Sequence, residues 1–94
     1  MGAMEKSVHT SEYRVLRAEL KKMRASAGLS QRELAQKLEV PHSWVAKVES
    51  GERRIDLVEF CWYALACGID PMTVFKRVAC IVQKPQLSHR SKRG

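Results

Sequence analysis

The sequence predicts an all-α fold, a single bundle of five short helices. Apolar residues recur at spacings of three and four along most of the chain, as they do on the buried face of a helix. Capping residues and the glycines or prolines that end helices divide this pattern into five segments. We find no convincing strand, and 94 residues are enough for one small domain with a modest core.

The first helix is expected to begin at Thr10 or Ser11, either of which can cap it. Gly28 ends it, as a residue that readily adopts the left-handed conformation. Its apolar stripe consists of Tyr13, Leu16, Leu20, Met23 and Ala27.

The second helix follows at once. Ser30 is its expected cap, and Glu33, three residues later, completes a capping box. Pro41 cannot continue this helix, but it can occupy the first turn of the next one. The inner face of the second helix is formed by Leu34, Ala35 and Leu38.

The third helix is expected over residues 41–50, with Val45 and Val48 inward and Gly51 as its stop. The fourth begins after Asp56, again with an acid three residues on, Glu59, and Gly68 closes it. Its expected inward residues are Leu57, Phe60, Cys61, Ala64 and Leu65.

The fifth helix is expected to start after Asp70, with Pro71 at its first position, and to end before Pro85. Its expected inward stripe is Val74, Phe75, Val78 and Ile81. We expect the folded domain to span residues 10–83. Residues 1–9 are expected to be disordered, with "MGAM" resembling a cloning remnant, and residues 84–94 to form a basic disordered tail.

The net charge of +7 favours an anionic partner, a nucleic acid rather than a membrane surface. No apolar run is long enough to span a membrane. The three cysteines, Cys61, Cys67 and Cys80, form no CxxC pair and lack a histidine at zinc-finger spacing. We therefore expect the three cysteines to behave as small buried apolar residues in a reducing cytoplasm. The alternative is that they form a metal site or a redox switch. We expect no metal and no cofactor.

The sequence contains no carboxylate pair and no Ser/His/Asp order of the kind that would suggest an enzyme. Instead, the second and third helices and their tight turn form a helix-turn-helix. The major groove of DNA is about 12 Å wide and admits one helix, so the second helix must stand clear of the body. Ala35 lies where the two helices would cross, and its small side chain would let them approach closely. The residues left outward or toward the groove are His42, Ser43, Trp44 and Lys47.

Residues 20–78 resemble the Cro/repressor-type (Xre) helix-turn-helix regulators of bacteria and phages. The resemblance is carried by Gly28-Leu29-Ser30-Gln31, by Glu33-Leu34-Ala35 with Leu38 and Val40, by Val45, Val48, Glu49 and Gly51, and by "ALACGIDP". It implies a five-helix lambda-repressor-like DNA-binding domain. One departure is Glu39, which occupies a turn position where the family often has glycine. A left-handed backbone there would cost glutamate roughly 1 kcal/mol relative to glycine.

The resemblance also implies roles for individual residues. It places His42, Ser43 and Lys47 at base-reading positions, and Trp44 where the family usually has something smaller. Trp44 faces DNA in one interpretation and finishes the core in the other. The resemblance implies an ion pair between Arg24 and Glu49. Contacts with the DNA backbone are implied for Gln31, Ser50, Arg53 and Arg54.

The fourth and fifth helices carry more apolar surface than a small monomer should expose. The residues concerned are Trp62, Met72, Phe75, Ala79 and Val82, and we expect them to form a two-fold dimer contact, or else to finish the monomer core. The predicted function is that of a cytoplasmic, nucleoid-associated repressor that binds an inverted repeat of double-stranded DNA as a homodimer. The alternative is an antitoxin-type module whose main ligand is a partner protein.

Overall fold

The computed structural model describes residues 10–82, and within them it contains five helices and no strand. The helices are α2 (Ser11–Ser26), α3 (Gln31–Leu38), α4 (Ser43–Ser50), α5 (Leu57–Ala66) and α6 (Pro71–Ile81). The predicted all-α class and the number of helices are therefore confirmed for this part of the chain. The expectations for residues 1–9 and 84–94 fall outside the described residues.

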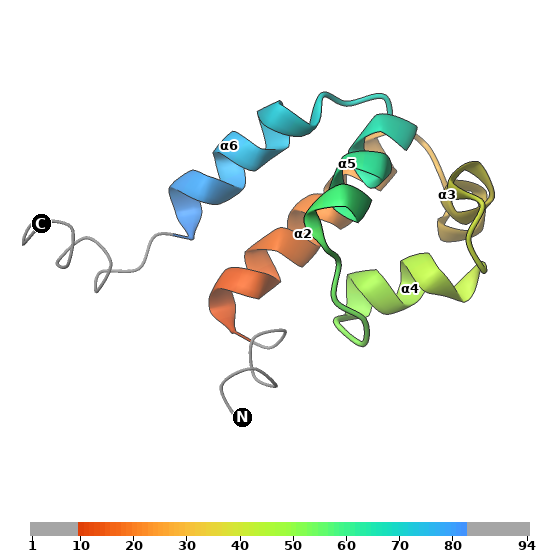
Figure 1. The fold of residues 1–94 in the computed structure, drawn as a ribbon, viewed down its shortest axis with the longest axis horizontal. Helices are drawn as coiled ribbons and strands as arrows, with labels where there is room; N and C mark the ends of the chain where they lie inside the picture. The colour runs from red at the N-terminus through yellow and green to blue at the C-terminus, as the bar shows by residue number, and fades with distance from the viewer. Residues whose placement is uncertain (1–9, 83–94) are drawn as a thin grey trace, which may run out of the picture.

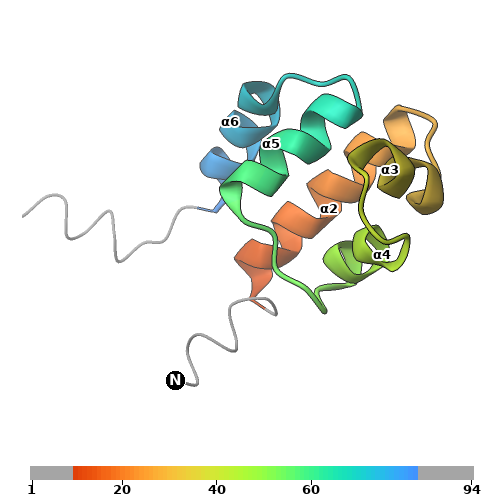
Figure 2. The same ribbon diagram turned by 45° about the vertical axis from the view of Figure 1, so that its right-hand side comes forward.

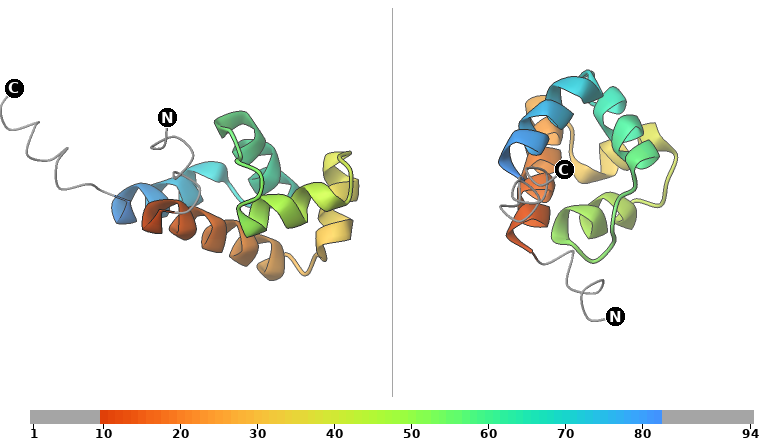
Figure 3. Two further views of the ribbon diagram at one scale, coloured as in Figure 1. Left: turned by 90° about the horizontal axis from the view of Figure 1, so that it is seen from below. Right: turned by 60° about the vertical axis from the view of Figure 1, so that its left-hand side comes forward.

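Helix α2 runs through the middle of the molecule and packs against α4, α5 and α6. Helix α3 packs against α4 and α5, so α3 and α4 lie together at one end while α6 lies at the other (Figures 1 and 2). Seen from below, α2 and α6 lie side by side, and α4 lies toward α3, away from α6 (Figure 3, left). The α3–α4 unit is thus supported from one side only.

Each helix contributes to one apolar core. Its fully or almost fully buried members are Leu20, Met23, Leu34, Ala35, Val45, Val48, Phe60, Tyr63, Ala64, Cys67 and Val74. Ala35 is completely buried, as expected for the small residue at the crossing of α3 and α4. Tyr63 is also completely buried, although it was not among the residues of this helix expected to point inward.

The predicted N-caps are confirmed. The Thr10 hydroxyl accepts a hydrogen bond from the Tyr13 amide at 3.1 Å. Ser30 and Asp56 each form a complete capping box, and Asp70 caps α6 with Pro71 at its first position. These bonds satisfy amides that would otherwise have no partner in the helix.

Helix α4 begins at Ser43, two residues later than predicted. Pro41 lies in the turn, where its carbonyl accepts the Trp44 amide at 2.9 Å. His42 occupies the N-cap position and makes no side-chain capping bond. The turn between α3 and α4 therefore takes up Pro41 and His42, which the sequence pattern had placed in the helix.

The predicted inward faces of the last two helices were partly wrong. Leu57 and Leu65 of α5 are 67% and 62% exposed, and Phe75 and Ile81 of α6 are 49% and 56% exposed. Apart from Glu59, helix α5 consists of apolar or aromatic residues that lie on every side of it, so spacing alone could not say which side would be covered. Ala27 is exposed because it lies at the C-cap of α2, beyond the last helical turn.

The cysteines differ from one another. Cys67 is buried, and burial raises the pKa of its thiol. Cys61 is half-buried, whereas Cys80 is exposed, so the expectation that all three are buried was wrong for Cys80. Among residues 10–82, no three His, Cys, Asp or Glu side chains lie close enough together to hold a metal ion. None of the helices in the same range is long and apolar enough to cross a membrane.

The turn after α3 contains the strained residue anticipated from the sequence. Glu39 has φ 59° and ψ 44°, a left-handed conformation, and among residues 10–82 every other residue with positive φ is glycine. Its amide donates to the carbonyls of Ala35 and Gln36, which closes α3. The strain is therefore tied to the geometry of the turn between α3 and α4.

Glu39→Gly is expected to raise the free energy of unfolding by up to about 1 kcal/mol, because glycine has no Cβ to strain the left-handed backbone. Glu39→Ala is the matched control, since it removes the same charge but keeps the Cβ. Urea denaturation of the three proteins checks this. Equal stabilisation by both substitutions would mean that the charge, and not the backbone, is responsible.

Candidate functional site

Helix α4 has two distinct sides. Val45 and Val48 are completely buried and anchor it to the core. Ser43, Lys47 and Ser50 are exposed. Because each residue advances the helix by about 100°, these three fall on the side opposite the two valines. The result is a short polar ridge, Ser43–Lys47–Ser50, that faces away from the body.

The other two predicted base-reading residues border this ridge. His42 is exposed at the start of α4. Trp44 is half-buried and packs at the edge of the core, so it lies between the two alternatives left open by the sequence. The guanidinium carbon of Arg53 lies 5.1 Å from the centre of the Trp44 ring, within the range of a cation–π contact.

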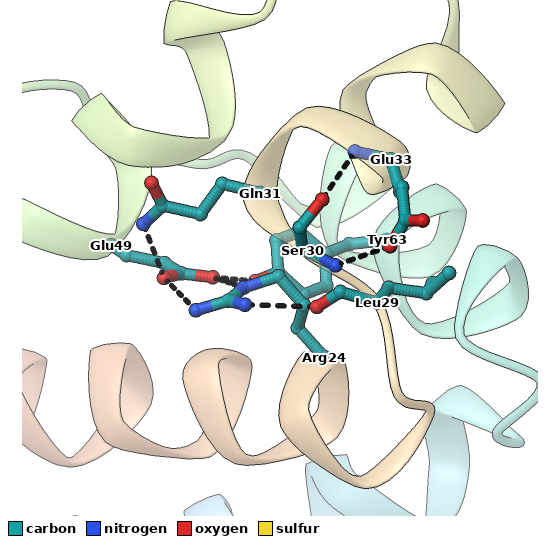
Figure 4. A network of polar contacts seen from close by, with 7 residues as sticks. All are labelled: Arg24, Leu29, Ser30, Gln31, Glu33, Glu49 and Tyr63. Atoms are coloured by element: carbon teal, nitrogen blue, oxygen red, sulfur yellow. Dashed lines mark hydrogen bonds and ion pairs between the residues drawn. The ribbon is translucent and has the colours of Figure 1, made fainter.

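The last turn of α4 is held by one carboxylate, that of Glu49 (Figure 4). The ion pair expected with Arg24 is present: Arg24 Nε and Nη2 donate to the two Glu49 oxygens at 2.7 and 3.0 Å. Gln31 Nε2 donates to Glu49 Oε1 at 3.0 Å, and the Tyr63 hydroxyl donates to Glu49 Oε2. One side chain of α4 is thus bonded to α2, α3 and α5.

The electrostatics of this cluster favour the ionised form of Glu49. Burial by itself would raise the pKa of the Glu49 carboxyl, since its side chain is only 4% exposed. Hydrogen bonds from Arg24, Tyr63 and Gln31 outweigh burial and hold that pKa below its ordinary value. Burial and the bond to Glu49 raise the pKa of Tyr63, so its hydroxyl stays a donor.

The same cluster orients two segments near the ridge. Arg24 Nη1 also donates to the carbonyl of Leu29 at 2.9 Å, which fixes the loop between α2 and α3. Gln31, the first residue of α3, is held through its amide nitrogen, as Figure 4 shows. Its predicted contact with the DNA backbone would therefore use the part of the amide that Glu49 leaves available.

Arg17 is a residue that the sequence interpretation missed. It lies seven residues, or two turns, before Arg24, so both face α4. Its Nη1 donates to the carbonyl of Ser50 at 3.2 Å, a favourable place for a cation at a helix C-terminus. Gly51 has φ 88°, and a Cβ there would lie 3.3 Å from the Arg17 guanidinium, so this end of α4 leaves little room for a side chain.

The two arginines after α4 have different environments. Arg54 is exposed, and its expected contact with a phosphate stays a prediction. Arg53 is instead paired with Glu59. Its Nη1 and Nη2 atoms donate to Oε1 and Oε2 of Glu59, each at 3.1 Å. Contact between Arg53 and a phosphate would have to use the N–H groups that Glu59 and the Arg54 carbonyl leave free, or displace Glu59, which the sequence interpretation did not foresee.

The residues expected at a dimer contact are mostly exposed. Trp62, Met72 and Phe75 are 54%, 58% and 49% exposed, Ala79 is also exposed, and Val82 is half-buried. The sequence interpretation missed the contribution of Leu57, Val58 and Leu65, which are exposed on α5. Leu57 and Phe75 line one apolar hollow of about 220 Å³. We refer to the exposed apolar residues Leu57, Val58, Trp62 and Leu65 of α5 and Met72, Phe75 and Ala79 of α6 as the apolar face.

Comparisons with known proteins agree with this arrangement. Residues 15–73 match the family described as "Helix-turn-helix domain". Among solved structures, an XRE-family like protein from Pseudomonas syringae pv. tomato is 34% identical, with a TM-score of 0.75. The alignment covers 85% of this chain and 98% of that one. A search of curated proteins gives no match.

Arg24→Ala is expected to lower the free energy of unfolding by about 3 kcal/mol or more, because it leaves the buried Glu49 carboxylate without its cation. Arg77→Ala is the control. Arg77 pairs with Glu19 at 3.1 Å but is 47% exposed, so its loss should cost less than about 1 kcal/mol. Chemical denaturation checks both. Similar losses of unfolding free energy in the two variants would show that the Glu49 cluster does not hold α4.

Proposed function

Because this chain belongs to the Xre family of helix-turn-helix regulators, it is a DNA-binding regulator, and we propose that it acts as a repressor on an inverted-repeat operator. The ridge of α4 enters the major groove, and α3 braces it across the backbone. Bound near a promoter, the protein excludes polymerase from the DNA that it covers. This is the function that the geometry supports best.

The observation that carries the proposal is the support of α4 by the Glu49 cluster. A helix can read bases only if its side chains are held in one orientation relative to the duplex. The polar ridge is exposed while the opposite side of the helix is anchored by Val45, Val48 and Glu49. In the proposed complex Lys47 and Ser43 donate to base edges, His42 and Trp44 contact the neighbouring bases or sugars, and Gln31, Ser50 and Arg54 contact phosphates.

The proposed homodimer uses the apolar face. Exposed apolar surface on a small domain usually marks a contact surface, and α5 has almost no polar side chain on its exposed side. A two-fold contact between two copies would cover Trp62, Leu65 and their neighbours. To read an inverted repeat, such a dimer has to present its two copies of α4 to successive major grooves, about 34 Å apart.

A partner protein is the alternative occupant of the apolar face. The same exposed residues on α5 favour it, because they would suit the groove-binding helix of another protein as well as a second copy. In that case the protein would act mainly through its partner, as an antitoxin-type subunit does.

Lys47→Ala is expected to reduce discrimination between a duplex selected from random DNA and a mismatched one by about 1 kcal/mol or more. Lys22→Ala is the control. It removes the same charge from α2, at an exposed position about 200° around that helix from the buried Leu20. Fluorescence anisotropy with both duplexes checks this. If Lys47→Ala weakens binding to both equally, Lys47 contacts phosphate and not bases.

Trp62→Glu is expected to convert the dimer to a monomer, because it places a charge within the proposed contact. Ile81→Glu is the control, at a residue of similar exposure, 56%, on another side of α6. Sedimentation at high micromolar concentration measures the mass of each protein. A monomeric wild-type protein would contradict the proposed homodimer and would favour the partner-protein alternative.

A further inference from the structure

The guanidinium of Arg53 is placed between the helix that we propose to read DNA and the start of α5. It lies over the ring of Trp44 in α4, at 5.1 Å from the ring centre. On its other side, Nη1 and Nη2 each donate to one oxygen of Glu59 at 3.1 Å. Nη1 also donates to the carbonyl of Arg54 at 2.8 Å. One cation therefore connects α4 with α5.

Both partners of this pair are held by the backbone. The Arg53 amide donates to the carbonyl of Lys47 at 3.1 Å, which folds the loop back on the last turn of α4. Glu59 accepts the Asp56 amide at 3.1 Å as part of the capping box of α5. The hydrogen bond between them lowers the pKa of Glu59 and raises that of Arg53, so both are charged near neutral pH.

The ion pair between Arg53 and Glu59 is strong enough to orient Arg53, yet exposed enough for Arg53 to exchange Glu59 for another anion. A bidentate arginine–carboxylate contact fixes the plane of the guanidinium. Arg53 is nevertheless 40% exposed and Glu59 17% exposed, in contrast to the nearly sealed Arg24–Glu49 pair. An arginine so close to α4 would pair with a phosphate of any sequence if nothing held it.

We propose that Glu59 is a specificity-determining positioning residue: it holds Arg53 against the indole of Trp44 and withholds that charge from DNA phosphates. Glu59 thereby lowers sequence-independent affinity and fixes the side chain that borders the reading ridge. The inference rests on the DNA-reading role proposed above for α4. It reverses the role that the sequence suggested for Arg53.

The test is Glu59→Gln, which keeps an acceptor for the Asp56 amide but loses the charged partner of Arg53. Binding to a duplex of arbitrary sequence is measured over a range of salt concentrations. The salt slope should steepen by about 0.9, as for one added phosphate contact, so the ratio of variant to wild-type affinity should grow about eightfold for each tenfold dilution of salt. Discrimination in favour of a duplex selected from random DNA should fall.

Two further variants isolate Arg53 as the cause. Glu52→Gln makes the same change of charge in the loop that carries Arg53, and no ion pair of Glu52 is found among residues 10–82. It should leave the slope near the wild-type value. Arg53→Ala combined with Glu59→Gln should remove the added slope. An unchanged slope in Glu59→Gln, or an equal change in Glu52→Gln, would overturn the proposal.

A spectroscopic readout examines the pair without DNA. The chain has two tryptophans, so Trp62→Phe leaves Trp44 as the reporter. In that background Glu59→Gln and Arg53→Ala should each shift the emission of Trp44, whereas Glu52→Gln should not. An unshifted emission in both would mean that Glu59 does not position Arg53. If no protein, wild type included, binds any duplex, the proposed function itself fails, and the emission still decides whether Glu59 holds Arg53.

Discussion

The arrangement of the whole domain depends on the buried carboxylate of Glu49. A buried carboxylate can only accept hydrogen bonds, so both of its oxygens must be supplied with donors. They come from Arg24 on α2, Gln31 on α3 and Tyr63 on α5. Satisfying one side chain thus requires four helices to meet in one geometry. The price of burying a charge is offset only when all these donors are present.

The position of this carboxylate explains why the cluster matters for function. Glu49 lies in the last turn of α4, while the exposed ridge lies on another side of the same helix. The cluster therefore restrains α4 without occupying the surface that DNA would meet. Arg17 adds a second support at the same end by donating to the carbonyl of Ser50. The N-terminal end of α4 has no side-chain cap, and there the buried Val45 anchors the helix.

The two arginine–glutamate pairs beside α4 differ in exposure, and this difference gives them different roles. The Arg24 and Glu49 side chains are 14% and 4% exposed, so little water or salt can compete for them. The Arg53 and Glu59 side chains are 40% and 17% exposed, within reach of a phosphate. The first pair fixes the fold, and the second controls how much positive charge is offered beside the reading helix.

Most helix starts and the presence of a helix-turn-helix could be predicted from the sequence. Capping residues at Thr10, Ser30, Asp56 and Asp70 act on amides two or three residues away, so local chemistry was sufficient to place these helix starts. Apolar residues lie on every side of α5, so tertiary packing had to select the side that is covered, with Tyr63 buried and Leu65 exposed. It also decided that Arg53 is paired with Glu59. Helix spacing fixes the neighbours of a side chain within one helix, whereas burial and ion pairing depend on which other helix lies opposite.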